Sequence, residues 1–263
     1  MLNKISVITP SYNSGDYIAE CIQSVLAQDQ IVSKHIIIDG GSKDGSLEII
    51  ESYAKQNSNI IYIAETDNGQ ADALNKGLAL IDTPYFGWLN ADDRYVPNIL
   101  SQLFSLTKEQ NLDELSIVYG DYRLIDVKGN IIGFRKQPTF SYFDCLYSYL
   151  TIHNGAALFN TQLTKKLGGF NERLKFAMDY DLILKITKGK QVLHIKEFIS
   201  DFRLHPSSKT SNLEYVRIEE TKRLRKHFSR HNNLSIYLLN KFSLLKVVLR
   251  MFREKILFER IKR

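Results

Sequence analysis

The sequence predicts an α/β fold with a mostly parallel β-sheet flanked by helices, and a helical, basic C-terminal extension. Short runs of β-branched and aromatic residues, such as Ile5–Pro10, are bounded by turn residues and indicate buried strands. Between these runs, apolar residues recur every three or four positions, as in Gln70–Ile81, which indicates helices. The alternation is typical of βαβ units, whose right-handed crossovers place parallel strands side by side.

In the first part of the chain, strands and helices alternate regularly. We expect strands at Ile5–Pro10, His35–Gly40, Ile60–Glu65 and Pro84–Leu89. We expect helices at Tyr17–Leu26, Leu47–Gln56 and Gln70–Ile81. The second strand is a continuous apolar run, which predicts burial on both faces of the sheet.

After Asp93 the pattern is less regular. Ser116–Asp126 and Asn130–Arg135 flank a Lys-Gly-Asn turn, which predicts an antiparallel pair. We also expect helices at Tyr95–Lys108 and Met178–Ile186, and strands at Ile152–Phe159 and His194–His205.

Composition limits the class of protein. Of the 263 residues, 44% are hydrophobic and 24% charged, which predicts a packed core. Cys21 and Cys145 stand alone, which argues against a disulfide framework or zinc site and fits a reducing cytosol. We find no signal-peptide pattern and no apolar run near the roughly 20 residues of a membrane span. We therefore expect a cytoplasmic protein, free or peripheral on the inner face of the plasma membrane.

The positive charge is concentrated near the C-terminus. Residues 215–263 contain 14 Lys/Arg and 4 Asp/Glu, whereas residues 1–214 contain 21 and 25. This distribution argues against a nucleic-acid-binding protein and favours a basic arm that faces an anionic surface. Within residues 238–256, Lys and Arg flank an apolar stripe made of Leu238, Phe242, Leu245, Leu249, Phe252 and Ile256. Such a stripe binds a membrane surface, packs on the folded body, or forms a homodimeric coiled coil.

Polar and acidic turns follow three of the predicted strands. They are Tyr12-Asn13, Asp39-Gly40-Gly41 and the turn from Asn90 to Asp93. Ligands of parallel α/β sheets bind outside the carboxyl ends of the strands, so these turns should share one ligand-binding edge. Asp92, with Asp93 or Asn90, offers the hard oxygen ligands that Mg²⁺ or Mn²⁺ prefers. The alternative is that Asp92 or Asp93 caps the next helix.

Six stretches together resemble the family 2 glycosyltransferases, which have the GT-A (Rossmann-like) fold and use nucleotide-sugar donors. They are ITPSYN (8–13), IIDGGSKDGS (37–46), ETDNGQADALNKGL (65–78), LNADD (89–93), AMDYDLILK (177–185) and FRLHPSSKT (202–210). They follow the family order and span most of the chain up to Thr210. The similarity is greatest to bacterial enzymes of exopolysaccharide or O-antigen synthesis.

The resemblance implies a domain organisation and a donor site. It places a catalytic domain at 1–212, with a nucleotide-binding half (1–93) and an acceptor half (94–212), before a basic tail at 213–263. It implies that donor contacts come from Pro10, Tyr12, Asn13, Asp39, Asp44, Asp67, Gln70, Asp72, Asn75, Lys76, Asn90, Ala91 and Asp92. Among these, Asp39 would face the base and Asp44 would brace its loop. Helix capping is an alternative role for both.

The resemblance also implies the chemistry. Asp92 corresponds to the metal-binding aspartate, with Asp93 or His205 assisting, and Asp179 corresponds to the catalytic base. Asn90 stands where the family usually has Asp, so it can hydrogen-bond a ribose but adds no charge. The alternative readings are a packed histidine for His205 and a helix-terminal carboxylate for Asp179.

We therefore expect an inverting, Mg²⁺- or Mn²⁺-dependent glycosyltransferase. Its donor would be a nucleotide sugar, with UDP favoured, and its acceptor a hydroxyl of a glycan or of a polyprenyl-linked lipid. Two alternatives are a nucleotidyltransferase of related fold and a non-catalytic nucleotide-sugar-binding module tethered to membrane. The first turn lacks the basic, glycine-rich loop that a triphosphate requires, which disfavours the nucleotidyltransferase.

Overall fold

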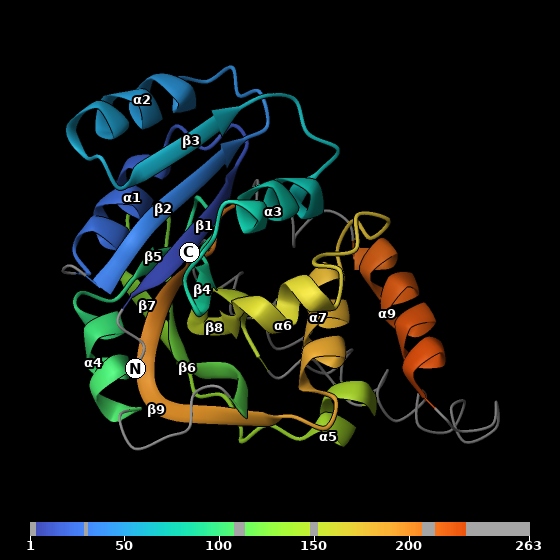
Figure 1. Ribbon diagram of the computed structural model, residues 1–263. Helices are drawn as coiled ribbons and strands as arrows, with labels where there is room; N and C mark the ends of the chain where they lie inside the picture. The colour runs from blue at the N-terminus through green and yellow to red at the C-terminus, as the bar shows by residue number, and fades with distance from the viewer. Residues whose placement is uncertain (1–3, 29–30, 108–113, 148–151, 207–213, 230–263) are drawn as a thin grey trace.

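A mixed nine-stranded sheet runs through the protein, with helices on both faces (Figure 1). The computed structural model describes residues 4–28, 31–107, 114–147, 152–206 and 214–229. In these residues the strand order is β3-β2-β1-β4-β8-β6-β9-β5, with β7 paired to β6.

The strands are β1 (Ile5–Ser11), β2 (Val32–Asp39), β3 (Ile60–Ala64), β4 (Tyr85–Trp88), β5 (Arg94–Tyr95), β6 (Leu115–Ile125), β7 (Ile131–Arg135), β8 (Ala157–Asn160) and β9 (Gln191–Arg203). The helices are α1 (Ile18–Leu26), α2 (Ser46–Gln56), α3 (Gln70–Ala79), α4 (Ile99–Leu106), α5 (Tyr142–Tyr147), α6 (Thr161–Lys166), α7 (Met178–Thr187) and α9 (Glu214–Phe228), with a 3-10 turn, η3 (Asn154–Ala156).

The first four strands are parallel, as the sequence predicted. β1 pairs with β2 on one side and β4 on the other, and β2 pairs with β3. Successive residues of β1 and β2 enter two different cores: Ile36 and Ile38 lie in one, and Ile37 lies in the other. The mostly parallel α/β fold and the double-sided burial of the second strand are therefore confirmed.

Helices α1, α2 and α4 pack against the core that contains Ile37, whereas α3, α5, α7 and α9 pack against the opposite core. The approach of α3 to the sheet is unusually close at Gly77. A Cβ atom there would lie 2.5 Å from Cγ2 of Ile8, so only glycine permits this spacing. Gln70, in the first turn of α3, hydrogen-bonds Asn90 after β4, so α3 begins at the carboxyl ends of the strands.

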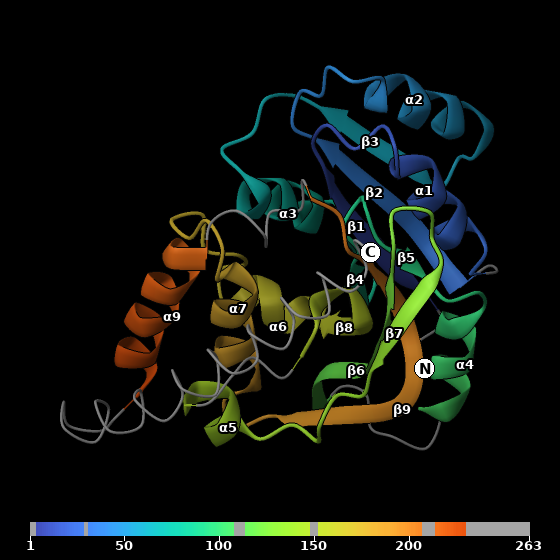
Figure 2. The same ribbon diagram turned by 180° about the vertical axis from the view of Figure 1, so that it is seen from behind.

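The second half of the sheet is mixed. The predicted pair β6–β7 is an antiparallel hairpin, and the long, curved β9 runs parallel to β6 (Figure 2). One expectation is wrong: the helix predicted from Tyr95 does not begin there, because Tyr95 and Arg94 form β5, which pairs with β9. Pro97 disfavours helical geometry at Val96, and Asn98 is left-handed (φ 57°), so α4 begins only at Ile99. The strand expected from Ile152 begins at Ala157, after η3.

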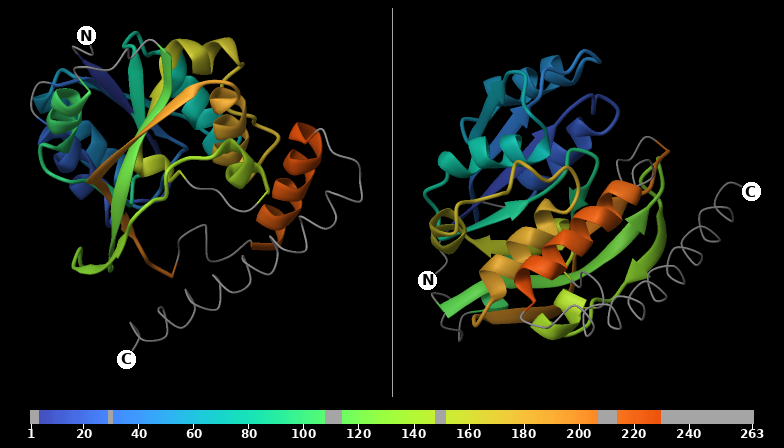
Figure 3. Two further views of the ribbon diagram at one scale, coloured as in Figure 1. Left: turned by 90° about the horizontal axis from the view of Figure 1, so that it is seen from below. Right: turned by 90° about the vertical axis from the view of Figure 1, so that its right-hand side faces the viewer.

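The start of the predicted basic tail is part of the folded body. α9 lies alongside α7 (Figure 3), and its Leu224 is buried in the core with α7. The apolar stripe of residues 238–256 lies outside the described residues, so its membrane or dimer contact stays a prediction. In the part of the chain that the structure describes, no helix is both long and apolar enough to cross a bilayer.

Candidate active site

The carboxyl ends of β1, β2 and β4 form one edge of the sheet, which we call the lip. Ser11, the last residue of β1, pairs with Asp39, the last residue of β2. Trp88 ends β4 beside Ile8 of β1, so Asn90 and Asp92 follow at the same edge. The predicted gathering of polar turns is thus present in the fold.

Asp39 organises the glycine-rich loop at the lip. Its carboxylate is fully buried and accepts hydrogen bonds from the amides of Gly41 (3.1 Å) and Ser42 (2.8 Å). It also accepts from the hydroxyls of Ser42 (2.6 Å) and Ser11 (3.1 Å). The contacts of Asp39 are therefore those of a loop brace, the role that the resemblance had implied for Asp44, and a contact of Asp39 with the base stays a prediction.

The loops after β1 and β2 are joined directly. The Asn13 amide donates to Ser42 Oγ (2.8 Å), and Asn13 Oδ1 accepts from the Lys43 amide (3.0 Å). Asp44 Oδ2 accepts from the Gly15 amide (2.8 Å), so Asp44 also links the two loops. Tyr12, next to Asn13, leaves 66% of its surface exposed at the rim. The result is a rigid pair of loops with an aromatic ring free to contact a ligand.

Asn90 connects the lip to α3. Its Oδ1 accepts hydrogen bonds from Gln70 Nε2 (3.0 Å) and Trp88 Nε1 (2.9 Å), and its amide donates to Asp93 Oδ2 (3.3 Å). A neutral amide both donates and accepts, whereas a carboxylate could not donate to Asp93. The Asn90 side chain thereby fixes the turn from which Asp92 projects.

Asp92 and His205 meet at the lip. His205 Nε2 lies 2.9 Å from Asp92 Oδ2, and the side chains are 8% and 27% exposed. The ring of Tyr17 supports His205 with 5.1 Å between centroids. This arrangement places an imidazole nitrogen beside a partly exposed carboxylate.

Asp93 lies inside the protein, behind Asp92. It is 1% exposed, and its Oδ1 accepts the backbone amide of Arg203 (2.9 Å). Burial, and then the neighbouring Asp92 carboxylate, raise the pKa of Asp93 well above its usual range. Because Asp93 is buried and both of its oxygens accept hydrogen bonds within the protein, we do not propose it as a metal ligand.

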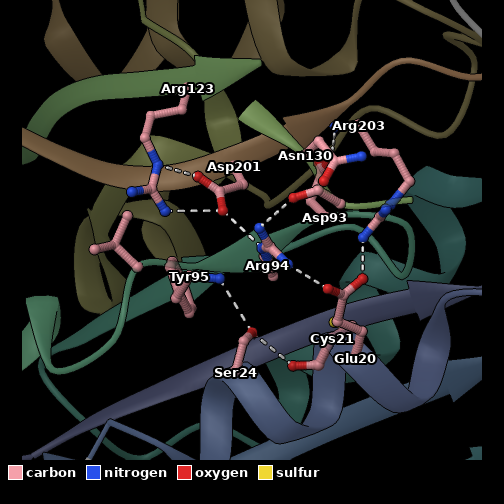
Figure 4. Close-up of polar contacts among 12 residues, drawn as sticks. Glu20, Cys21, Ser24, Asp93, Arg94, Tyr95, Arg123, Asn130, Asp201 and Arg203 are labelled. Atoms are coloured by element: carbon pink, nitrogen blue, oxygen red, sulfur yellow. Dashed lines mark hydrogen bonds and ion pairs between the residues drawn. The ribbon is translucent and has the colours of Figure 1, made fainter. Parts of the chain in front are cut away.

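A network of partly buried charges adjoins the turn that contains Asp93 (Figure 4). The Asp201 carboxylate of β9 forms ion pairs with Nε of Arg94 in β5 (2.6 Å) and Nε of Arg123 in β6 (2.5 Å). Arg94 also pairs with Glu20 of α1, which pairs in turn with Arg203 of β9. The network ties α1 to β5, β6 and β9.

Arg203 stands at one end of this network and joins it to the Asp92 turn. Its side chain is 1% exposed, and Nε donates to the backbone oxygen of Asp92 (2.8 Å). Nη1 donates to the backbone oxygen of Asp126 in the β6–β7 turn (3.1 Å), and the guanidinium lies 4.8 Å from the Tyr17 ring centroid. Because His205 follows two residues later, Arg203 fixes both Asp92 and the backbone that presents His205.

The polar residues predicted around α3 bond mainly to their own segment. Asp67 accepts from the Gly69 amide (2.8 Å), and Asp72 accepts from the Asn68 amide (2.9 Å). Lys76 Nζ lies 2.8 Å from Glu65 and 3.3 Å from Asp72. These contacts shape the turn before α3, and the predicted donor contacts of these residues stay predictions. Pro10 and Ala91 belong to the lip through β1 and the Asp92 turn.

Asp179 lies in the first turn of α7 and is half-buried. Asp181, which also lies in that turn, is buried and pairs with Lys185 (2.5 Å). The segment before α7 is joined to α3, because Asn75 bonds the backbone of Phe170 and Glu172 Oε1 (2.7 Å). α3 thus links the loop before α7, through Asn75, to the Asn90 turn, through Gln70.

Two polar groups at the lip suit a divalent cation. Asp92 supplies a carboxylate and His205 an imidazole nitrogen. Over the described ranges, no group of three or more His, Cys, Asp or Glu side chains could hold an ion alone. Mg²⁺ and its relatives are commonly bound by one or two carboxylates together with substrate phosphates, so this set fits an ion that arrives with a phosphate ligand.

Sequence comparison decides the family. The model of "Glycosyl transferase family 2" matches residues 6–168, which is more than half of the chain. The chain belongs to glycosyl transferase family 2. It is therefore a glycosyltransferase, as the resemblance implied, and the match includes the lip and α3.

Curated relatives of this glycosyltransferase include an uncharacterised glycosyltransferase of Rickettsia typhi, 35% identical over 225 residues. That alignment covers 82% of this chain and 68% of the relative. A chondroitin synthase of Escherichia coli is 29% identical over 203 residues, covering 76% of this chain but 29% of the synthase. Polysaccharide synthesis is thus found among its relatives.

Solved structures confirm the fold. Staphylococcus aureus TarS, in complex with UDP-GlcNAc, matches with a TM-score of 0.69 at 18% identity, covering 92% of this chain and 71% of TarS. A mannosyltransferase from Pyrobaculum calidifontis, in complex with GDP-Man and Mn²⁺, matches with a TM-score of 0.67 at 17% identity, covering 92% and 69%. The GT-A-like arrangement of a mostly parallel sheet between helices is shared.

Sequence reasoning missed Arg203, Glu20 and Asp201 in this glycosyltransferase. A signal was present: Asp201 and Arg203 interrupt an apolar strand at alternate positions, which is unusual unless both are paired. Their partners on α1, β5 and β6 could not be found, because those pairings depend on the register of β9.

Proposed function

We propose that this glycosyltransferase transfers a sugar from a nucleoside-diphosphate sugar, with UDP favoured, to a hydroxyl of a glycan or lipid-linked acceptor in bacterial surface polysaccharide synthesis. The observation that carries the proposal is the contact between Asp92 and His205, which are 113 positions apart in sequence and meet at the ligand-binding edge. The chondroitin synthase relative supports the polysaccharide context.

The lip provides a preorganised place for the nucleotide. Asn13, Asp39 and Asp44 hold the two loops together through their hydrogen bonds, so the loop backbone is in place before the donor binds. The Tyr12 ring is exposed beside these loops. Preorganisation lowers the entropy lost on binding. A flat base packed on Tyr12 fits this edge.

Asp92 and His205 would hold a Mg²⁺ or Mn²⁺ ion. The ion would neutralise charge on the diphosphate as it leaves. Asp93 and Arg203 support this pair: the Arg203 side chain donates to the Asp92 carbonyl, and the Asp93 carboxylate accepts the Arg203 amide. These two bonds hold the backbone from which the Asp92 carboxylate projects.

Asp179 serves as the general base. In the proposed reaction, the acceptor oxygen forms a bond to the anomeric carbon, and the bond from that carbon to the diphosphate oxygen breaks. The leaving nucleoside diphosphate takes the electron pair, while Asp179 takes the proton of the acceptor hydroxyl. A single displacement from the face opposite the diphosphate inverts the anomeric configuration.

A donor screen tests this proposal. The purified protein is incubated with UDP-, GDP- and other nucleotide sugars, with and without Mn²⁺, and nucleoside diphosphate release is followed. We expect release from at least one donor only with the metal. Binding without any release would favour a binding module, and pyrophosphate release from a nucleoside triphosphate would favour a nucleotidyltransferase.

A further inference from the structure

Glu220, on α9, contacts the start of α7. Its side chain is buried, with 7% of the residue exposed. Oε1 accepts the Lys175 amide (2.8 Å), and Oε2 accepts the amides of Phe176 and Ala177 (both 2.9 Å). One carboxylate thus satisfies three consecutive backbone amides from a helix more than 40 residues away in sequence.

This contact holds the chain where it enters α7. Ala177 stands at the N-cap position and makes no side-chain hydrogen bond to the helix. Glu220 accepts the amides of Ala177 and of the two residues before it, which precede Met178, the first residue of the helix. A carboxylate at this point is favoured by the partial positive charge of the helix N-terminus.

α9 also contacts the residue that follows Asp179. Arg225 hydrogen-bonds the hydroxyl of Tyr180, the residue after Asp179, and Tyr180 also donates to the Leu146 carbonyl (2.9 Å). Leu224, one turn after Glu220, is buried in the same core as α7, which fixes the rotation of α9. The two helices lie side by side in both views of Figure 3.

We propose that Glu220 is a positioning residue for catalysis: by binding the amides of residues 175–177 it sets the position of Asp179, two residues later. The inference rests on the proposed function, in which Asp179 is the base. Asn75 of α3 bonds the same loop earlier, at Phe170 and Glu172. The loop that leads into α7 is therefore held by α3 near its start and by α9 at its end.

The family match ends at residue 168, so neither α7 nor α9 lies within it. If Glu220 positions Asp179, α9 is required for catalysis, although it lies within residues 213–263, which were predicted to form a tail.

The test compares Glu220→Gln with Glu219→Gln. Glu219 lies on the same helix and pairs with Lys222 (2.8 Å), away from α7. Glutamine keeps the shape of Glu220 but retains one acceptor oxygen and brings an NH₂ donor against amide donors. We expect kcat to fall about tenfold in Glu220→Gln, while Kd for UDP with Mn²⁺ stays within about twofold and the control keeps both values.

A double variant separates positioning from general damage. In the Asp179→Asn background, Glu220→Gln should lower the residual rate by no more than about twofold, because its effect passes through Asp179. Hydrogen exchange at residues 175–180 should speed up in Glu220→Gln, and Glu220→Asp should give an intermediate kcat if the first variant does not fold.

The outcomes are distinguishable. A wild-type kcat in Glu220→Gln, an equal loss of rate in the Asp179→Asn background, or a parallel loss of UDP affinity overturns the positioning role. If the wild-type protein turns over no nucleotide sugar, the proposed function fails instead, and this role fails with it.

Discussion

His205 Nε2 lies 2.9 Å from Asp92 Oδ2, although the first residue follows β9 and the second follows β4. The two residues are far apart in sequence, and only the fold brings them together. β9, which lies between β6 and β5 in the sheet, ends near the lip, and its Arg203 bonds the Asp92 backbone there.

The first prediction concerns this pair. His205→Ala should weaken Mn²⁺ activation by about tenfold, because one of two protein ligands is lost while the phosphates remain. Asp92→Ala should remove metal-dependent UDP binding. Calorimetric titration of UDP at a series of Mn²⁺ concentrations measures both effects. UDP binding in Asp92→Ala that still responds to Mn²⁺ like the wild type would show that the ion is held elsewhere.

The second prediction concerns Arg203. Arg203→Met leaves the Asp92 and Asp126 carbonyls without their buried donor and Glu20 without one partner. We expect a loss of about 2–4 kcal/mol in the free energy of unfolding, measured by urea denaturation. The matched control is Lys34→Met, which breaks a surface pair with Asp82 and should unfold at the wild-type urea concentration. Equal stability of the two variants would mean that the Arg203 network is not a structural support.

The sheet and helices of the first half could be predicted because each is a long, regular pattern. Ile5–Ser11 and Gln70–Ala79 each carry their own periodicity, and the turns between them contain the expected residues. The gathering of Asn90 and Asp92 at one edge followed from the rule for parallel sheets.

The features that could not be predicted depend on distant partners. β5 is two residues long, and only its pairing with β9 makes it a strand. In the sequence, Glu220 looks like one more surface charge on a polar helix, yet its carboxylate binds three backbone amides just before α7. Asp93 looked like the second half of an acidic pair at the lip, but the amide of Arg203 holds it inside. Such roles are set by tertiary contacts, for which a single sequence carries no periodic signal.

The third prediction concerns pH. His35 of β2 is fully buried beside Thr9 Oγ1 (2.9 Å), and burial lowers the pKa of His35 from 6.5 to about 3. Since the folded pKa lies below the unfolded one, the unfolded chain binds the proton first as the pH falls. Stability should therefore be full above about pH 6.5 and decrease towards pH 3, by up to about 1.4 kcal/mol per pH unit.

His35→Gln should remove this part of the pH dependence. Urea denaturation at several values between pH 7 and pH 4 measures it as the difference in slope between wild type and variant. His227→Gln changes an exposed histidine and serves as the control. Parallel slopes for the wild type and His35→Gln would mean that His35 does not contribute.

In the proposed mechanism, Asp179 removes the proton of the acceptor hydroxyl, while residues of the lip bind the donor. The most direct test measures donor binding and sugar transfer together on Asp179→Asn. We expect the Kd for the nucleotide sugar with Mn²⁺ to stay within about twofold, and the transfer rate to fall by about 100-fold or more. Transfer at the wild-type rate by Asp179→Asn, from a site that still binds the donor, would contradict the account.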